Sequence, residues 1–180
     1  MVGLTFSVAG AARPAGANPI GEFLRSRQRL NGGAKMLAPV KLARARLQSA
    51  ATFLEIATPD GLSAALQAVR ASSLNCYVFD ALADDTLETR ASLVTQQLRL
   101  YPCTFRIVLK SATSYAAPAY KDVANQLLAD LVLGYEATDI ALGKACAGDS
   151  SALAEAQARL ADTQRVVADI EGLLVEVLDV

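Results

Sequence analysis

The chain contains no histidine and no tryptophan among its 180 residues, and only 6% of the residues are aromatic. Histidine is the side chain best suited to acid–base catalysis near neutral pH and is the commonest metal ligand. Carboxylate-bridged di-iron bundles, for example, use Glu-x-x-His pairs that this sequence cannot supply. We therefore expect a protein that is not an enzyme and that holds no metal and no cofactor.

Nucleotide and hydrolase signatures are also missing, because no GxxxxGK[ST], GxGxxG or GxSxG motif occurs. Asn31-Gly32-Gly33 is interpreted as a helix stop rather than as part of a phosphate loop, since neither a preceding strand nor a Lys-Ser/Thr pair accompanies it. Two groups of acidic residues lack the spacing of a metal site. The first, Asp80, Asp84 and Asp85, is interpreted as a solvated loop. The second, Asp130, Glu136 and Asp139, is interpreted as a solvated face or as ion-pair partners for basic helices.

Long apolar runs are absent as well, although 53% of the residues are hydrophobic. Charged residues interrupt even the most apolar stretch before it reaches the roughly 18–20 residues that cross a bilayer. Much of the hydrophobic content is alanine, which favours closely packed helices. We expect a soluble chain whose residues 1–17, rich in small residues and free of acids, are a targeting remnant or an extended tail.

Cysteine is scarce, and no CxxC pair indicates zinc or a redox centre. Buried structural thiols are the favoured interpretation of Cys76, Cys103 and Cys146, because cysteine is among the most buried residue types. One disulfide is the alternative, with Cys76 and Cys103 as the possible pair. A catalytic thiol is disfavoured, because it normally needs a base such as histidine.

Charge is abundant but unevenly distributed. Residues 1–50 hold eight bases and one acid, whereas the remainder holds nine bases and seventeen acids. Such asymmetry indicates a basic element that meets an acidic surface. The candidate partner-binding residues are Phe23, Arg25, Arg27, Arg29, Lys35, Lys41, Arg44 and Arg46.

Helical periodicity covers most of the chain. Asn18-Pro19 is a helix start that opens a short basic helix, which Asn31-Gly32-Gly33 ends. Further long helices are predicted at 39–57, 59–80, 86–116 with a bend at Pro102, 118–144 and 151–178. Three of the predicted apolar seams are Val40, Ala43, Leu47, Ala50, Leu54 and Ala57; Val123, Leu127, Leu128, Leu131 and Tyr135; and Leu153, Ala156, Leu160, Thr163, Val167, Ile170, Leu174 and Val177.

Short connections between these helices favour an all-α, up-and-down four-helix bundle, with five helices if every predicted break is real. An irregular basic N-terminal arm is expected to precede the bundle. We divide the chain into this arm with its short basic helix, residues 1–34, and the bundle, residues 35–180.

The C-terminal half, from Leu87 to Val177, resembles the PsbQ-like family, the oxygen-evolving enhancer protein 3 group of the thylakoid lumen. The resemblance rests on the predicted helix 118–144 and on Leu160 in the helix after it; within the first of these, the matching residues are Leu128, Leu131, Asp139, Ala141 and Lys144. It implies a four-helix bundle with an N-terminal arm that docks on a photosynthetic membrane complex. The chain departs from the family in having three cysteines and fewer lysines.

Two functions follow as expectations. The first is a non-catalytic accessory, stabilising or assembly subunit of a thylakoid membrane complex, held in the chloroplast lumen through an acidic protein surface or an anionic membrane surface. The second is a free-standing bundle that binds a small apolar ligand or lipid in a pocket lined by Tyr77, Phe79, Tyr101, Phe105 and Tyr115. Nucleic acid is not expected as a partner, because the sequence pI is about 5.5.

Overall fold

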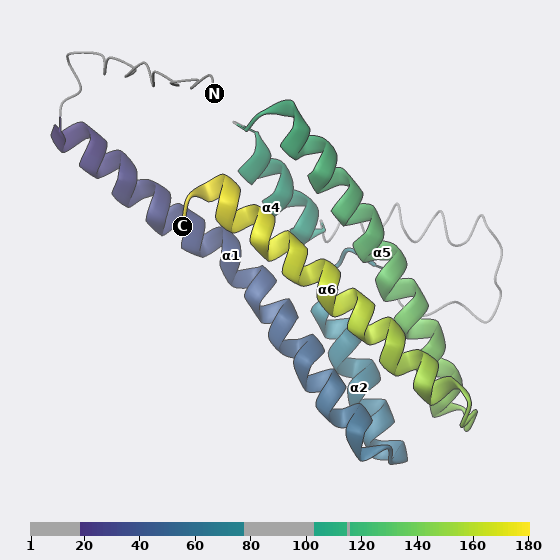
Figure 1. The fold of residues 1–180 in the computed structure, drawn as a ribbon. Coiled ribbons are helices and arrows are strands. Elements are labelled where there is room, and N and C mark those ends of the chain that lie inside the picture. Colours follow the sequence, from purple (N-terminus) through teal and green to yellow (C-terminus); the bar gives the residue numbers. More distant parts are fainter. Residues whose placement is uncertain (1–18, 78–102, 115) are drawn as a thin grey trace, which may run out of the picture.

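The chain folds into an all-α bundle (Figure 1). The computed structural model describes residues 19–77, 103–114 and 116–180, with side chains from residue 32 onward. Within these ranges there are helices and no strands. The helices are α1 (Pro19–Ile56), α2 (Pro59–Ser72), α4 (Thr104–Thr113), α5 (Pro118–Cys146) and α6 (Ala152–Leu178).

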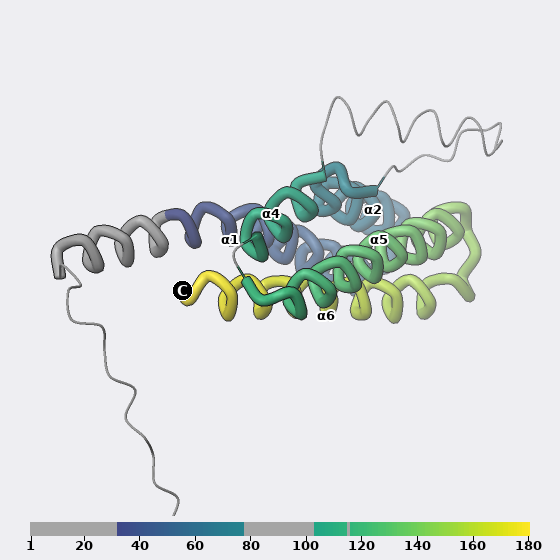
Figure 2. The backbone as a smooth tube through the Cα atoms, turned by 90° about the horizontal axis from the view of Figure 1, so that it is seen from above, coloured from purple at the N-terminus to yellow at the C-terminus, as the bar shows by residue number. Residues whose placement is uncertain are grey.

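Three long helices, α1, α5 and α6, each occupy one corner of the bundle, and the two shorter helices share the fourth. Helix α2 packs on α1 and α5, while α4 packs on α5, α1 and α6 nearer the other end. Figures 1 and 2 show α4 following α2 along the same side of the bundle. This shared corner, called the second corner below, corresponds to the second helix of an up-and-down bundle, and it is divided into α2, which ends at Ser72, and α4, which begins at Thr104.

Helix α1 corrects the predicted boundary between arm and bundle. It runs unbroken from Pro19 to Ile56, through Gly32, Gly33 and Pro39, so no helix stops at the glycines or starts at the proline. Gly33 is buried, and a Cβ at this position would lie 2.7 Å from Cγ1 of the C-terminal Val180. The glycine thus serves close packing rather than helix termination, and the 34/35 division falls inside α1.

The predicted seams are largely confirmed. Val40, Leu47 and Leu54 of α1 are at most 1% exposed. In α6 the central seam residues are fully or almost fully buried, namely Ala156, Leu160, Thr163, Val167, Ile170 and Leu174. These residues meet because positions three and four apart share one helical face. Most of one face of every long helix is therefore buried in the common core.

Two seam positions were wrong. Val123 is 48% exposed, and the neighbouring Ala124 is buried in its place, because the face of α5 is rotated by one residue near its start. Ala57 does not continue α1: it lies outside the helix with φ 52° and is exposed. Thr58 then caps α2, since its Oγ1 accepts a hydrogen bond of 3.1 Å from the Gly61 N–H, as the Thr-Pro start predicts.

The predicted helix 59–80 also ends early. Helix α2 stops at Ser72, and Leu74 and Asn75 adopt left-handed backbone with φ 50° and 64°. A continued helix is therefore wrong at residues 73–77. The predicted helix 86–116 is confirmed over α4, whereas its first part lies outside the described residues.

Candidate functional site

The eight predicted partner-binding residues all fall within α1. Phe23, Arg25, Arg27 and Arg29 lie in the N-terminal part of this helix, where the structure describes the backbone only. Figure 1 shows that this part of α1 continues past the C-terminal end of α6. The other four residues lie where α1 packs on the bundle, and they divide into two pairs with different surroundings.

Arg44 and Arg46 bind within the bundle. Arg44 Nη1 lies 2.9 Å from Oε2 of Glu171 on α6. Arg46 Nη1 donates a hydrogen bond to the carbonyl oxygen of Ala71, near the C-terminal end of α2. Two of the predicted docking cations thus link α1 to α6 and to α2, which the sequence did not indicate.

Lys35 and Lys41 are exposed, and within the described part of the chain neither forms an ion pair. Leu42, which follows Lys41, is 47% exposed. A large apolar side chain between cations can add buried area to an electrostatic contact. Leu42 was not predicted as a partner-binding residue, because it lies outside the apolar seam of α1 and carries no charge.

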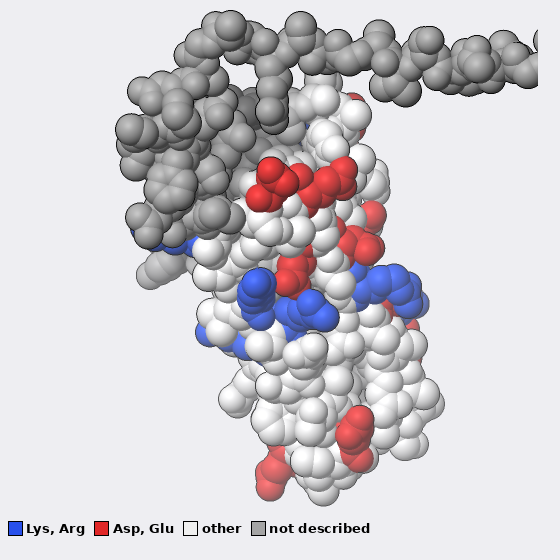
Figure 3. Space-filling model, turned by 60° about the vertical axis from the view of Figure 1, so that its left-hand side comes forward, with Lys and Arg blue, Asp and Glu red and all other residues white. Residues whose placement is uncertain are grey.

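The polarised charge of the sequence is therefore partly matched inside the fold. Besides Arg44–Glu171, Arg70 Nε lies 3.0 Å from Oδ1 of Asp139, which joins α2 to α5. Asp139 was interpreted as a solvated residue or a partner for a basic helix, and it is an ion-pair partner. Figure 3 shows Lys and Arg side chains in a band across the middle of one face, with acidic side chains above and below them.

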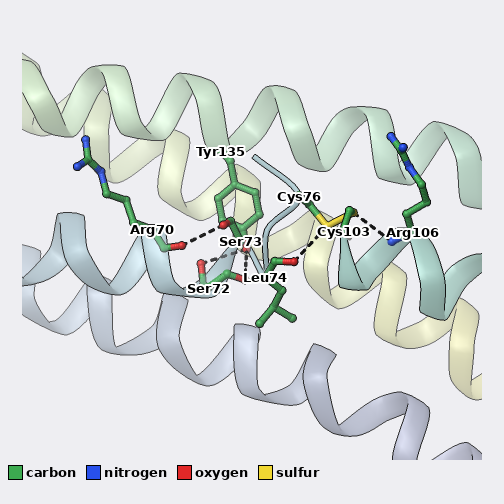
Figure 4. The surroundings of a disulfide bond; sticks show 8 residues. All are labelled: Arg70, Ser72, Ser73, Leu74, Cys76, Cys103, Arg106 and Tyr135. Atoms are coloured by element: carbon green, nitrogen blue, oxygen red, sulfur yellow. Dashed lines mark hydrogen bonds between the residues drawn. A yellow bond between two sulfur atoms is a disulfide. The ribbon is translucent and has the colours of Figure 1, made fainter. Parts of the chain in front are cut away.

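Cys76 and Cys103, the possible pair named from the sequence, are joined by a disulfide (Figure 4). The favoured interpretation as buried free thiols is wrong for these two. The bond lies at the interruption of the second corner, between the turn after α2 and the start of α4. Cys146 is a free thiol and is exposed, so it is not a buried structural residue either.

A buried hydroxyl pair lies beside this turn (Figure 4). The hydroxyl of Tyr135 on α5 donates to the Ser72 carbonyl oxygen over 2.9 Å, and the Ser72 hydroxyl lies 3.0 Å from the Tyr135 oxygen. Both side chains are fully buried. Burial raises the pKa of Tyr135 well above its usual value, although the hydrogen bond with Ser72 acts in the opposite direction. Tyr135 thus holds the last carbonyl of α2 from the adjacent helix α5.

The predicted aromatic pocket is not assembled from the side chains that the structure describes. Phe105 is fully buried in the core and Tyr77 is partly buried, while Phe79, Tyr101 and Tyr115 lie outside the described residues. A hollow of about 450 Å³ lies instead between α5 and α6. It is lined by Leu133, Gly134, Glu136, Ala137, Ile140, Arg159 and Asp162, so no aromatic residue forms its wall.

No group of three or more Cys, Asp or Glu side chains capable of holding a metal ion occurs among the described residues. Asp80, Asp84 and Asp85 fall outside them. None of the described helices combines the length and the apolar character needed to cross a membrane.

Comparisons with protein-family models, with curated proteins and with solved structures find no match to this chain. The resemblance to the PsbQ-like family therefore stays a prediction from the sequence.

Proposed function

We propose that this chain is a non-catalytic accessory, stabilising or assembly subunit that docks through basic α1 on an acidic surface of a larger membrane protein complex. The observation that carries the proposal is the division of the α1 cations. Arg44 is paired with Glu171 and Arg46 donates to the Ala71 carbonyl, whereas Lys35 and Lys41 are exposed and lack an ion pair with described residues. The two lysines without an ion pair thus lie N-terminal to Arg44 and Arg46 along α1.

The same helix continues from Lys35 back to Pro19, and the intervening sequence contains Arg25, Arg27 and Arg29. A rise of 1.5 Å per residue makes this N-terminal extension roughly 24 Å long. A basic helix of that length suits an acidic groove or surface on a partner protein. Exposed Leu42 supplies an apolar contact beside Lys41, as is common in protein interfaces.

The resemblance to the PsbQ-like family supports a finer form of the proposal, in which the complex is photosynthetic and the chain lies in the thylakoid lumen of the chloroplast. The Cys76–Cys103 disulfide is compatible with an oxidising compartment. The ligand-binding alternative receives no such support, because Phe105 fills the core rather than a pocket.

The test is affinity purification of the tagged full-length chain from its native source in mild detergent. The docking variant is Lys35→Glu with Lys41→Glu, and the matched control is Lys110→Glu with Lys121→Glu, which reverses two exposed lysines on α4 and α5. We expect the wild-type chain and the control to retain one membrane complex, identified by its membrane subunits, and the docking variant to lose it. High salt should release the complex from the wild-type chain, because exposed charges are screened.

Retention of the complex by the docking variant at both salt concentrations would overturn the role of α1. Recovery of an unaccompanied chain from every sample would overturn the proposal as a whole. Identification of a complex without thylakoid subunits would overturn only the finer form, since the acidic partner would then belong to another membrane.

A further inference from the structure

The Cys76–Cys103 disulfide is asymmetric in its surroundings. Cys103 is the N-cap residue of α4, and its Sγ accepts a hydrogen bond of 3.3 Å from the Arg106 N–H. The first turn of α4 contains no acidic residue. A helix N-terminus stabilises negative charge through its free N–H groups and its dipole. Negative charge on sulfur is therefore favoured at Cys103.

Cys76 has the opposite surroundings. Its Sγ lies 3.7 Å from the carbonyl oxygen of Leu74, which carries partial negative charge and disfavours a thiolate. Cys76 is also partly exposed, whereas Cys103 is only 4% exposed. An external thiolate can thus approach Cys76 more readily. When the S–S bond breaks, its electron pair is better accommodated on the Cys103 sulfur.

The backbone before Cys76 is strained. Leu74 and Asn75 both have positive φ, a conformation that is costly for a branched side chain such as leucine. The Leu74 carbonyl also accepts a hydrogen bond from the Thr104 N–H over 3.1 Å, so the turn after α2 is joined directly to the start of α4. Cleavage of the disulfide removes one of the ties that hold this turn in place.

We propose that Cys76–Cys103 is a thiol–disulfide exchange site for a protein dithiol reductant of the thioredoxin-like class, with Cys76 attacked and Cys103 leaving. The reductant thiolate forms a bond to Cys76 Sγ as the Cys76–Cys103 bond breaks, and the electron pair departs on Cys103, which takes up a proton. The second thiol of the reductant then attacks the mixed disulfide and releases Cys76. Two electrons and two protons pass to the chain, and the dithiol becomes a disulfide.

This inference does not depend on the docking function of α1. It assigns a reversible joint to the interrupted corner of the bundle: the oxidised form ties the turn after α2 to α4, and the reduced form leaves the Thr104–Leu74 hydrogen bond as the direct backbone link between them. Reduction is expected to loosen residues 73–76 and the first turn of α4 while α6 stays packed.

The first experiment identifies the attacked sulfur. The full-length chain with Cys146→Ser, which removes the exposed free thiol, is oxidised and mixed with a thioredoxin-like protein whose resolving cysteine is serine. Peptide mass mapping of the trapped adduct should place the intermolecular bond at Cys76. An adduct at Cys103, or no adduct, would overturn the proposal.

The second experiment tests the helix terminus. Arg106→Glu places a negative charge in the first turn of α4, and Lys110→Glu makes the same charge change in its last turn. Reduction by the intact dithiol should slow by about two- to threefold in Arg106→Glu, because the leaving thiolate is less stabilised. Lys110→Glu should change the rate by less than about 1.5-fold. Equal rates in the two variants would contradict the leaving-group assignment.

Hydrogen exchange reports the consequence for the fold. The Cys76 N–H donates to the Ser73 carbonyl, and the Thr104 N–H donates to Leu74. Both amides should exchange at least about tenfold faster after reduction, whereas amides of central α6 should not change. Unchanged protection at residues 76 and 104 would overturn the loosened joint.

Discussion

Helix α1 and the second corner of the bundle differ in how helix continuity relates to local sequence. Helix α1 continues through Gly32, Gly33 and Pro39, all of which disfavour helix, whereas the second corner breaks after Ser72, where neither glycine nor proline occurs. Glycine and proline cost about 1 and 3 kcal/mol in a helix interior. The comparison shows that a long buried seam can outweigh such local costs.

The second corner is divided between α2 and α4, and cross-links hold these two helices together. The disulfide joins its two parts, and Tyr135 of the adjacent α5 donates a hydrogen bond to the last carbonyl of α2. Continuity in α1 thus comes from burial along one helix, while alignment of α2 with α4 depends on contacts between elements.

Removal of the disulfide should have the largest effect. Closing a loop over a sequence separation of 27 residues lowers the entropy of the unfolded chain. This effect is worth about 3.5 kcal/mol. We expect Cys76→Ser with Cys103→Ser to lose about that free energy of unfolding in urea titrations. Cys146→Ser is the control and should change stability little; a double variant within about 0.5 kcal/mol of the wild type would show that the corner does not need its cross-link.

Pro39→Ala should stabilise the protein, because it restores an N–H to the middle of α1. The expected gain is about 1–3 kcal/mol in thermal or urea unfolding. Pro59→Ala is the matched control, since Pro59 occupies the first position of α2, where proline is favourable. A loss of stability in Pro39→Ala would mean that α1 tolerates the proline because the fold needs its geometry.

Tyr135→Phe should lower the free energy of unfolding by about 1–2 kcal/mol, because the buried Ser72 carbonyl in the second corner loses the hydroxyl that donates to it. Tyr120→Phe is the control: its hydroxyl donates a hydrogen bond to Glu176 in an exposed position, so the expected loss at neutral pH is much smaller. Equal losses from the two variants would contradict a special role for the buried hydroxyl.

Tyr135 also makes the free energy of unfolding depend on pH in the alkaline range. Because burial raises the pKa of Tyr135, the folded chain keeps the phenol proton at pH values where the unfolded chain has released it. The contribution of the protonated Tyr135 to the free energy of unfolding is complete below about pH 10. It falls as the pH rises further, by up to about 1.4 kcal/mol per pH unit. Unfolding titrations between pH 8 and about 11 should show a steeper decline in the wild type than in Tyr135→Phe.

The adjacent glycines Gly32 and Gly33 of α1 give the smallest effect. Gly32→Ala should stabilise by up to about 1 kcal/mol, since alanine favours helix. A Cβ at position 32 meets nothing within 4 Å. Gly33→Ala should gain less, because its Cβ would lie 2.7 Å from Val180 Cγ1 and the C-terminal residue must shift. Equal gains, measured by thermal unfolding, would show that the Val180 contact has no energetic weight.

Much of the fold follows from local patterns. The three-and-four repeat of α6 and the Thr58-Pro59 start of α2 were predicted because both depend on residues within a few positions of each other. The candidate docking residues were named from composition alone. Composition could not separate Arg44 from Lys41, because Glu171 lies 127 residues from Arg44 in the sequence.

The sequence by itself determined the all-α class, most seam positions and the uneven charge, since periodicity and composition are local properties. Tertiary structure decided that α1 runs through its glycines and proline, that Cys76 meets Cys103, and which cations are matched within the bundle. The physical reason is that burial, cross-linking and ion pairing depend on distances in space between residues far apart in the chain, and periodicity carries no record of those distances.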